Sequence, residues 1–187
     1  DVGLGRACEM ITASHSRLMA QYNEWMNSRM YALCASLPGA ELHKDRGAFF
    51  KSIYATLNHI TYSDLAFLSR FTGNPSVVPE PGADLFGTFD LLRANRATLD
   101  QRILVWAESL SPEWLAEPLT YTSKIDGKTR TVPKWVLVTH MFNHQTHHRG
   151  QAHTILSICT GKEPPVLDLL AMQRGAAAPD LRALASR

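Results

Sequence analysis

Apolar side chains recur every three or four residues along four long segments of this 187-residue chain. This spacing is typical of amphipathic helices, whose apolar side packs against neighbouring helices. We predict helices over residues 5–37, 46–71, 88–110 and 133–160. Each segment ends at glycine or proline, or at a Ser-Pro turn, which are common helix terminators. The pattern therefore predicts an all-α fold, a four-helix bundle.

The segments that join these helices differ in character. Residues 74–86 contain three prolines, which predicts a long crossover loop without regular structure. Residues 119–125 and 128–132 are rich in threonine and flank an Asp-Gly pair, a pattern that predicts a short β-hairpin before the last helix. We expect one domain over residues 1–187, of which about 161–187 form a C-terminal extension.

Half of the chain's eight histidines lie within residues 139–151 of the last predicted helix: His140, His144, His147 and His148. At about 100° per residue, the first, second and fourth of these share the apolar face of the helix. An imidazole that points at a core needs a partner, because burying an unpaired polar group costs a few kcal/mol. Histidines four residues apart commonly find that partner in a metal ion. The alternative is a set of ordinary histidines bonded to side chains or water, and three in register favour the metal.

One ion cannot bind all three histidines of this face. A rise of about 1.5 Å per residue separates His140 from His148 by about 12 Å, whereas a Zn–N bond is about 2.0–2.1 Å long. The pair is therefore His140 with His144 or His144 with His148, and a third ligand should come from another helix. We expect His147 to flank the pair as a hydrogen-bonding residue and His153 to point away from it.

The remaining histidines and the cysteines have simpler interpretations. His15 and His43 have no ligand types nearby and should lie at the surface. From the residues alone, His59 is also expected to be exposed. The cysteines, at positions 8, 34 and 159, form no CxxC pair and no even set, so we expect reduced, buried thiols.

Three polar residues lie at positions where helix packing matters. Asp64 belongs to the apolar stripe of the second predicted helix and should have a histidine or arginine partner. Asn23 and Asn27, four residues apart, either line a pocket or face solvent, and solvent is the commoner environment for each alone.

Charge and hydropathy exclude some classes of function. The net charge of +2 comes from 19 basic and 17 acidic residues without a long basic block, so nucleic acid is not an expected partner. No apolar run has the length of a membrane span, and the first residues lack a secretory signal pattern. We expect a soluble, cytoplasmic protein.

Three short motifs are similar to those of a known family: Tyr22-Asn23-Glu24-Trp25-Met26-Asn27, Asn58-His59-Ile60, and the segment from His140 to Gln151. Through them the chain resembles the DinB family of DinB/YfiT-like metalloenzymes over most of its length, up to about Asp168. The resemblance implies a metal site formed by His59, His144 and His148, which reverses the expectation that His59 is exposed. It also implies nickel or zinc as the ion and a homodimer as the assembly.

Three histidines around one ion resemble a catalytic zinc site, since structural sites usually have four protein ligands. Such an ion can activate water for attack on an electrophile or stabilise a thiolate. The resemblance therefore implies a metal-dependent hydrolase or a thiol S-transferase with a small-molecule substrate. The alternative is a non-catalytic, stress-associated metal-binding dimer.

Hydrolysis and thiol transfer require different residues next to the metal ion. The candidates for the general base of a hydrolase are Asp64, Glu24 and His147. The candidates for a groove that holds a thiol cofactor are Asn23, Asn27, Arg149 and Gln151. Two simpler roles are also expected in the last helix: Arg149 turns away from the metal face to bond loops or a dimer partner, and Gly150 allows close helix packing.

Overall fold

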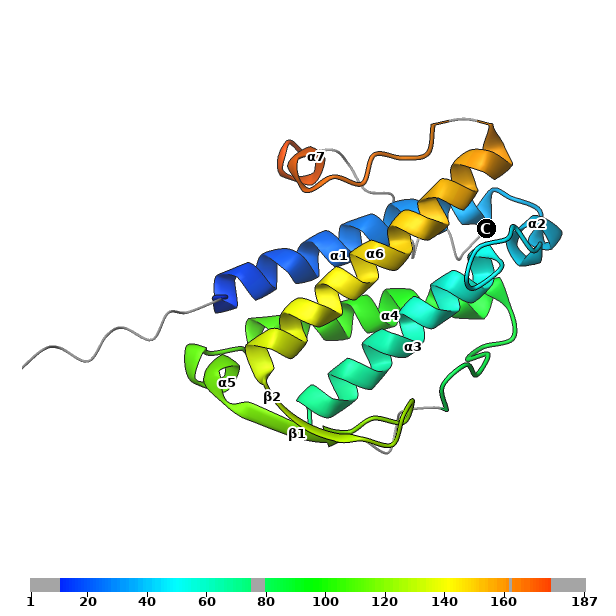
Figure 1. Cartoon of the computed structure of the whole chain (residues 1–187). Helices are drawn as coiled ribbons and strands as arrows, with labels where there is room; N and C mark the ends of the chain where they lie inside the picture. Colours follow the sequence, from blue (N-terminus) through cyan, green and yellow to red (C-terminus); the bar gives the residue numbers. More distant parts are fainter. Residues whose placement is uncertain (1–10, 75–79, 162, 176–187) are drawn as a thin grey trace, which may run out of the picture.

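Four long helices lie side by side in the computed structural model of this chain, which describes residues 11–74, 80–161 and 163–175 (Figure 1). They are α1 (Ala13–Ala35), α3 (Ile53–Phe71), α4 (Phe89–Glu108) and α6 (Lys134–Thr160). Helix α1 packs mainly against α4, and α3 packs mainly against α6. The predicted four-helix bundle is confirmed.

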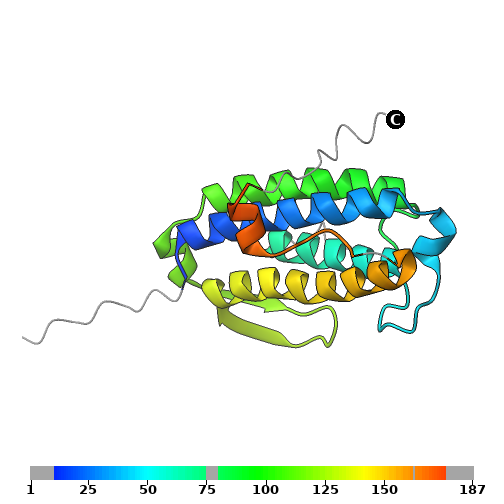
Figure 2. The same ribbon diagram turned by 90° about the horizontal axis from the view of Figure 1, so that it is seen from above.

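Three short helices and a hairpin complete the described part of the chain: α2 (Gly39–His43), α5 (Pro112–Ala116), α7 (Leu169–Gln173), β1 (Pro118–Thr122) and β2 (Thr129–Pro133). None of these three short helices was expected from the sequence. Helix α7 lies across α1, as Figure 2 shows, and Ala171 of α7 packs in one apolar cluster with Tyr22 and Trp25 of α1.

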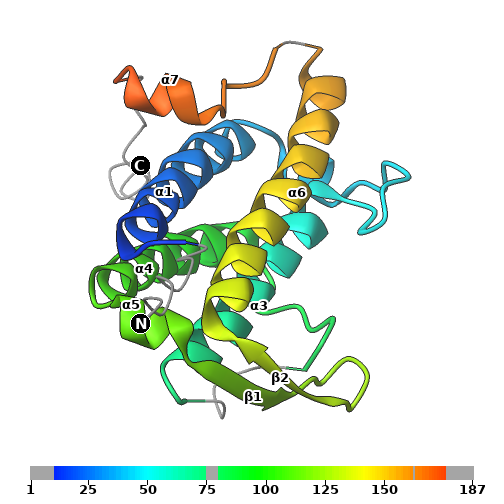
Figure 3. The same cartoon turned by 60° about the vertical axis from the view of Figure 1, so that its left-hand side comes forward.

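The hairpin forms where the threonine-rich alternation predicts it. Its strands pair antiparallel, with Pro118 opposite Pro133. The hydroxyl oxygens of Thr120 and Thr131 are 2.8 Å apart across the strands, a cross-strand contact that stabilises the ladder. Strand β2 runs directly into α6, so the hairpin lies at the end of the bundle where α6 begins (Figure 3).

Side-chain caps set the helix starts. The hydroxyl groups of Thr12, Ser52 and Thr88 accept a backbone N–H in the first turns of α1, α3 and α4. At the other end of α6, Gly161 takes the left-handed conformation (φ 60°) typical of a helix C-cap. The predicted start of α1 at residue 5 falls outside the described residues, but residues 11–12 lie before the helix, which begins at Ala13 after the Thr12 cap. The predicted start of α3 at residue 46 is wrong, because residues 48–51 form a turn before Ser52.

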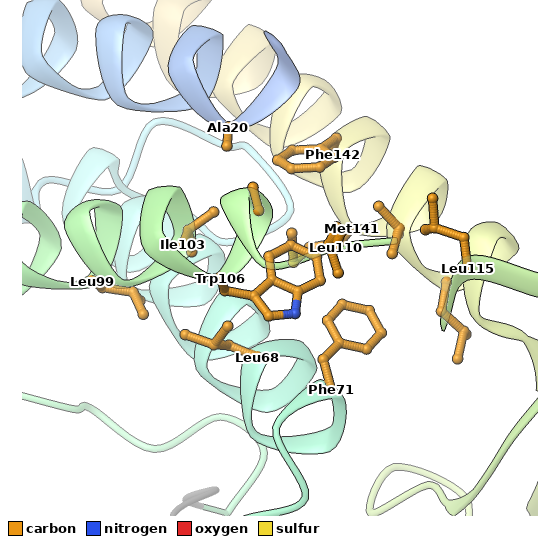
Figure 4. Close-up of a cluster of buried hydrophobic side chains, with 13 residues drawn as sticks. Ala20, Leu68, Phe71, Leu99, Ile103, Trp106, Leu110, Leu115, Met141 and Phe142 are labelled. Carbon is orange, nitrogen blue, oxygen red and sulfur yellow. The ribbon is translucent and has the colours of Figure 1, made fainter. Parts of the chain in front are cut away.

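Besides the small cluster under α7, two large apolar clusters lie one after the other along the bundle axis. The first, at the hairpin end, is centred on Trp106, whose ring stacks on Phe71 at 5.0 Å (Figure 4). The second, at the end near α2, includes Met30, Ile60 and Leu156. Burial of apolar area in both clusters holds the four helices together.

Between the two clusters lies a layer of buried polar side chains, which we call the polar layer. Every long helix contributes to it: Asn23 and Asn27 from α1, Asp64 from α3, Arg96 and Asp100 from α4, and Gln145 and Arg149 from α6. All of them are at most 2% exposed, so each needs partners inside the protein.

None of the helices in the described ranges combines the length and the apolar character that a membrane crossing requires.

Candidate metal centre

Three histidines from two helices converge at the level of the polar layer. His59 comes from α3, and His144 and His148 come from successive turns of α6. One ring nitrogen from each lies within 4.8 Å of the other two, so the group could hold a metal ion. The Nε2 atoms of His59 and His144 are 3.1 Å apart. The structure thus brings the His144–His148 pair, and not His140, together with a histidine from a second helix.

The spacing suits a metal ion. Two nitrogens at about 2.0–2.1 Å from a tetrahedral zinc ion lie about 3.3 Å apart, close to the 3.1 Å between the Nε2 atoms of His59 and His144. Imidazole nitrogens also suit nickel, copper and iron. The three residues therefore fit a divalent transition metal both in geometry and in donor type.

His148 is held in the tautomer that a metal requires. Its Nδ1 lies 2.8 Å from Oε1 of Gln151, one turn further along α6. An amide oxygen only accepts, so Nδ1 carries the hydrogen and Nε2 keeps its lone pair free for an ion. In contrast, Nδ1 of His144 is buried and makes no hydrogen bond within the described part of the chain.

Burial keeps all three rings neutral. It lowers the pKa of His59 from 6.5 to about 4, and nearby His148 lowers it further. Burial is also the main cause that lowers the pKa of His144 to about 3, with smaller effects from the surrounding histidines. The pKa of His148 is lowered by burial as well. Neutral imidazoles are the form that binds metal, so no proton has to leave at neutral pH.

A phenylalanine ring covers part of this group. Phe50, from the turn before α3, stacks on the ring of His59 at 4.1 Å and 22°. The same ring meets His148 edge-on at 5.3 Å. Phe50 therefore contacts two of the three histidines and contributes to the burial that lowers their pKa values.

Two further histidines of α6 flank the group. His140 is exposed, with its ring 5.7 Å from His144 and 5.4 Å from Phe67. His147 is also exposed, with its ring 4.7 Å from His148 and its Nε2 3.3 Å from Nε2 of Gln151. His147 thus lies beside the centre and makes a hydrogen bond, as the sequence predicts.

Two buried carboxylates, Asp64 and Asp100, are hydrogen-bonded within the polar layer. Asp64 binds Arg96 through one oxygen and accepts from the Gln145 amide through the other. The prediction that Asp64 has an arginine or histidine partner is confirmed. Arg96 also donates to Asp100 at 2.7 Å. With both oxygens engaged in a fully buried network, Asp64 is not placed as a general base.

The same layer corrects three expectations. Asn23 and Asn27 do not face solvent; both donate to Asp100, at 3.0 and 2.9 Å. Arg149 does not bond loops or an exposed surface, because it is buried and donates to the amide oxygens of Asn23 and Asn27. These three residues are held inside the bundle and do not line a groove for a thiol cofactor.

Other candidates also lie away from the three-histidine group. The carboxylate of Glu24 accepts a hydrogen bond from Gln101 of α4 at 2.6 Å. Gly150 is exposed and a Cβ there would meet nothing within 4 Å, so it is not needed for close packing within the described chain. Gln151, expected in a cofactor groove, instead orients His148.

The remaining titratable residues lie largely as expected. His15 and His43 are exposed, although the ring of His43 packs on Tyr54 at 4.3 Å. His153 points away from the group and contacts the Pro165 carbonyl. Cys34 is buried and Cys159 is half-buried, both as free thiols, and Cys8 lies outside the described residues.

The roles of Gln151 and Phe50 at the three-histidine group were not identified from the sequence. The spacing of Gln151, three residues after His148, places it within reach on a helix and could have indicated its role. Phe50 carries no comparable signal, because it comes from a turn whose position depends on the folded structure.

Fold and site thus define the class of protein: a helical bundle with three convergent histidines on two helices. The chain belongs to the DinB family, whose sequence model matches residues 10–181. The match continues past Asp168, where the resemblance was expected to end. The chain is also 24% identical over 148 residues to Protein DinB of Bacillus subtilis (strain 168), an alignment that covers 73% of this chain and 81% of that protein.

Proposed function

We propose that this chain is a metal-dependent enzyme that acts on a small molecule, with one zinc or nickel ion held by His59, His144 and His148. The observation that carries the proposal is the convergence of three neutral imidazoles from two helices within 4.8 Å. Membership of the DinB family supports the same site.

The number of protein ligands favours catalysis over a structural role. Structural zinc sites usually have four protein ligands, whereas catalytic sites have three and leave room for water or substrate. Within the described residues the group comprises three histidines and no cysteine or carboxylate. When bound, the ion would supply Lewis acidity that lowers the pKa of a thiol or water ligand.

Of the two reactions, transfer of a substrate thiol fits the surrounding residues better than hydrolysis. A thiolate stabilised by the ion is already a nucleophile and needs no separate base. Asp64 and Glu24, two candidates for that base, are hydrogen-bonded elsewhere in the bundle. The protein would bind and orient the substrate thiol. Gln151 keeps His148 in the tautomer that binds metal.

Hydrolysis is the second candidate, and the position of His147 is the observation that favours it. This exposed ring lies 4.7 Å from the ring of His148. A histidine next to the centre is suitable for taking a proton from water as a general base.

The test is turnover by the zinc- or nickel-loaded chain on thiol-plus-electrophile pairs, esters and amides. We expect activity on the first group that is lost in His144→Ala and kept in His140→Ala, the neighbouring histidine outside the group. Wild-type activity on esters that is lost in His147→Ala would favour hydrolysis. A tightly held ion that raises the melting temperature without turnover on any substrate would support the non-catalytic, stress-associated bundle.

We also propose a homodimer in the cytoplasm. Leu91 of α4 is an exposed large apolar side chain that a second copy could cover. The free thiols of Cys34 and Cys159 suit a reducing compartment. Light scattering is expected to give twice the mass of one chain, and a monomer at micromolar concentration would contradict the dimer.

A further inference from the structure

The segment between α2 and α3 contains a β-turn with phenylalanine at both central positions. Lys51 N–H donates to the Ala48 carbonyl at 2.8 Å, so Phe49 and Phe50 form the corner of the turn. Such corners usually hold glycine, proline, asparagine, aspartate or serine. Lys51 then takes a φ of 66°, the left-handed region that favours glycine. Among the described residues, no other non-glycine residue has a positive φ.

Hydrogen bonds fix this turn in one conformation. Arg46 N–H donates to the Lys51 carbonyl at 2.7 Å, and Ser52 N–H donates to the Phe50 carbonyl at 2.7 Å. The Arg46 side chain forms an ion pair with Glu41 of α2. The residues of this turn depart from the usual turn preferences, yet the turn is held in place. Such departures are typical of functional sites.

The two rings extend outward from the metal centre. Phe50 stacks on His59 and meets His148 edge-on. Phe49 packs edge-on against Phe50 at 4.8 Å and 87°, and it is 85% exposed. In Figure 2 this segment (cyan) projects on the same side of α6 as the hairpin. An apolar surface thus runs continuously from two of the three histidines to the solvent.

We propose that Phe49 and Phe50 form the apolar wall of the substrate site and select substrates that carry an aromatic group close to the metal-binding atom. The proposal rests on the proposed function and names its substrate class. Phe50 is immobilised against the histidines, so it provides a rigid surface. Phe49 is exposed, so it loses contact with water when an aromatic group packs on it, which favours binding.

The test compares two thiols that differ only in an aromatic ring, ethanethiol and 2-phenylethanethiol. Their dissociation constants are measured by calorimetry with zinc-loaded wild type, Phe49→Ala and Val105→Ala. Val105 is the control, because it is an exposed apolar residue (73%) on α4, which carries no histidine of the group. The same titrations with metal-free protein show whether binding needs the ion.

We expect zinc-loaded wild type and Val105→Ala to bind the aromatic thiol about tenfold more tightly than ethanethiol. In Phe49→Ala this ratio is expected to fall towards one while zinc content stays the same. Equal affinity of the wild type for both thiols, or an unchanged ratio in Phe49→Ala, would overturn the inference and leave the proposed function standing.

Two other results separate the inference from the proposed function. A wild-type chain that retains no zinc, or that binds neither thiol, would refute the proposed function and the substrate class with it. If Phe49→Ala changes the oligomeric state but not the ratio, Phe49 belongs to a subunit interface and the inference is wrong.

Discussion

His148 Nδ1 donates a hydrogen bond to Oε1 of Gln151 at 2.8 Å, one helical turn further along α6. This bond selects the tautomer whose Nε2 lone pair is free to bind an ion. Metal sites depend strongly on such supporting hydrogen bonds, and their loss typically costs 10- to 100-fold in metal affinity.

Gln151→Leu is therefore expected to weaken zinc binding about 10-fold or more. Gln151→Glu keeps an acceptor for Nδ1 and should bind zinc at least as tightly as the wild type. Competition with a chromophoric chelator measures both affinities. Thr154→Leu, at an exposed position of the same helix, is the control. Similar affinities in Gln151→Leu and Thr154→Leu would show that the bond does not support the site.

The polar layer leads to a prediction about stability. Asp64→Ala leaves the buried Arg96 with one carboxylate fewer and removes the acceptor of the Gln145 amide. Breaking a buried ion pair from one side typically costs about 3–5 kcal/mol in the free energy of unfolding. Urea denaturation measures this loss, which should be smaller in Asp64→Asn. Asp126→Ala, which breaks the exposed pair with Arg130, should change stability little. Equal losses in Asp64→Ala and Asp126→Ala would contradict this account.

The neutral histidines predict how the stability of the metal-free protein depends on pH. In the unfolded chain His59 and His144 accept protons near pH 6.5, whereas in the folded chain their pKa values are about 4 and about 3. Between these values the unfolded state binds more protons. The free energy of unfolding should therefore fall as the pH falls from about 6.5 towards 4.

Thermal melts in the presence of a chelator check this pH dependence. The decline should be smaller in His59→Gln, which removes one of the two groups. A melting temperature that stays constant or rises as the pH falls through this window would contradict the lowered pKa values.

The helices were largely predictable because their apolar spacing reflects the packing of one face. The start of α3 was missed because Ala48, Phe49 and Phe50 suit a helix, although Gly47, with a φ of 72°, and the capping Ser52 are local signals for a later start. The turn at Phe49 and Phe50 forms because hydrogen bonds and the contact of Phe50 with His59 stabilise it. The contact of Phe50 with His59 depends on the folded structure and is not specified by the local sequence.

The candidate site was predictable in part. Helical spacing identified two possible pairs on α6, and the family resemblance, not the spacing, indicated His59. The polar layer was missed although its members occur as pairs four residues apart on three helices: Asn23 with Asn27, Arg96 with Asp100, and Gln145 with Arg149. Each pair alone resembles a solvated helix face, and only the packing of the four helices brings the pairs together in the core.

The central claim is that His59, His144 and His148 hold one divalent ion. Elemental analysis of protein purified without a metal-binding tag tests it directly, in the wild type, His59→Ala, His148→Ala and the control His140→Ala. The account predicts about one zinc or nickel ion per chain in the wild type and the control, and a sharp loss in the other two variants. No ion in the wild type after incubation with zinc and nickel, or equal content in all four proteins, would contradict it.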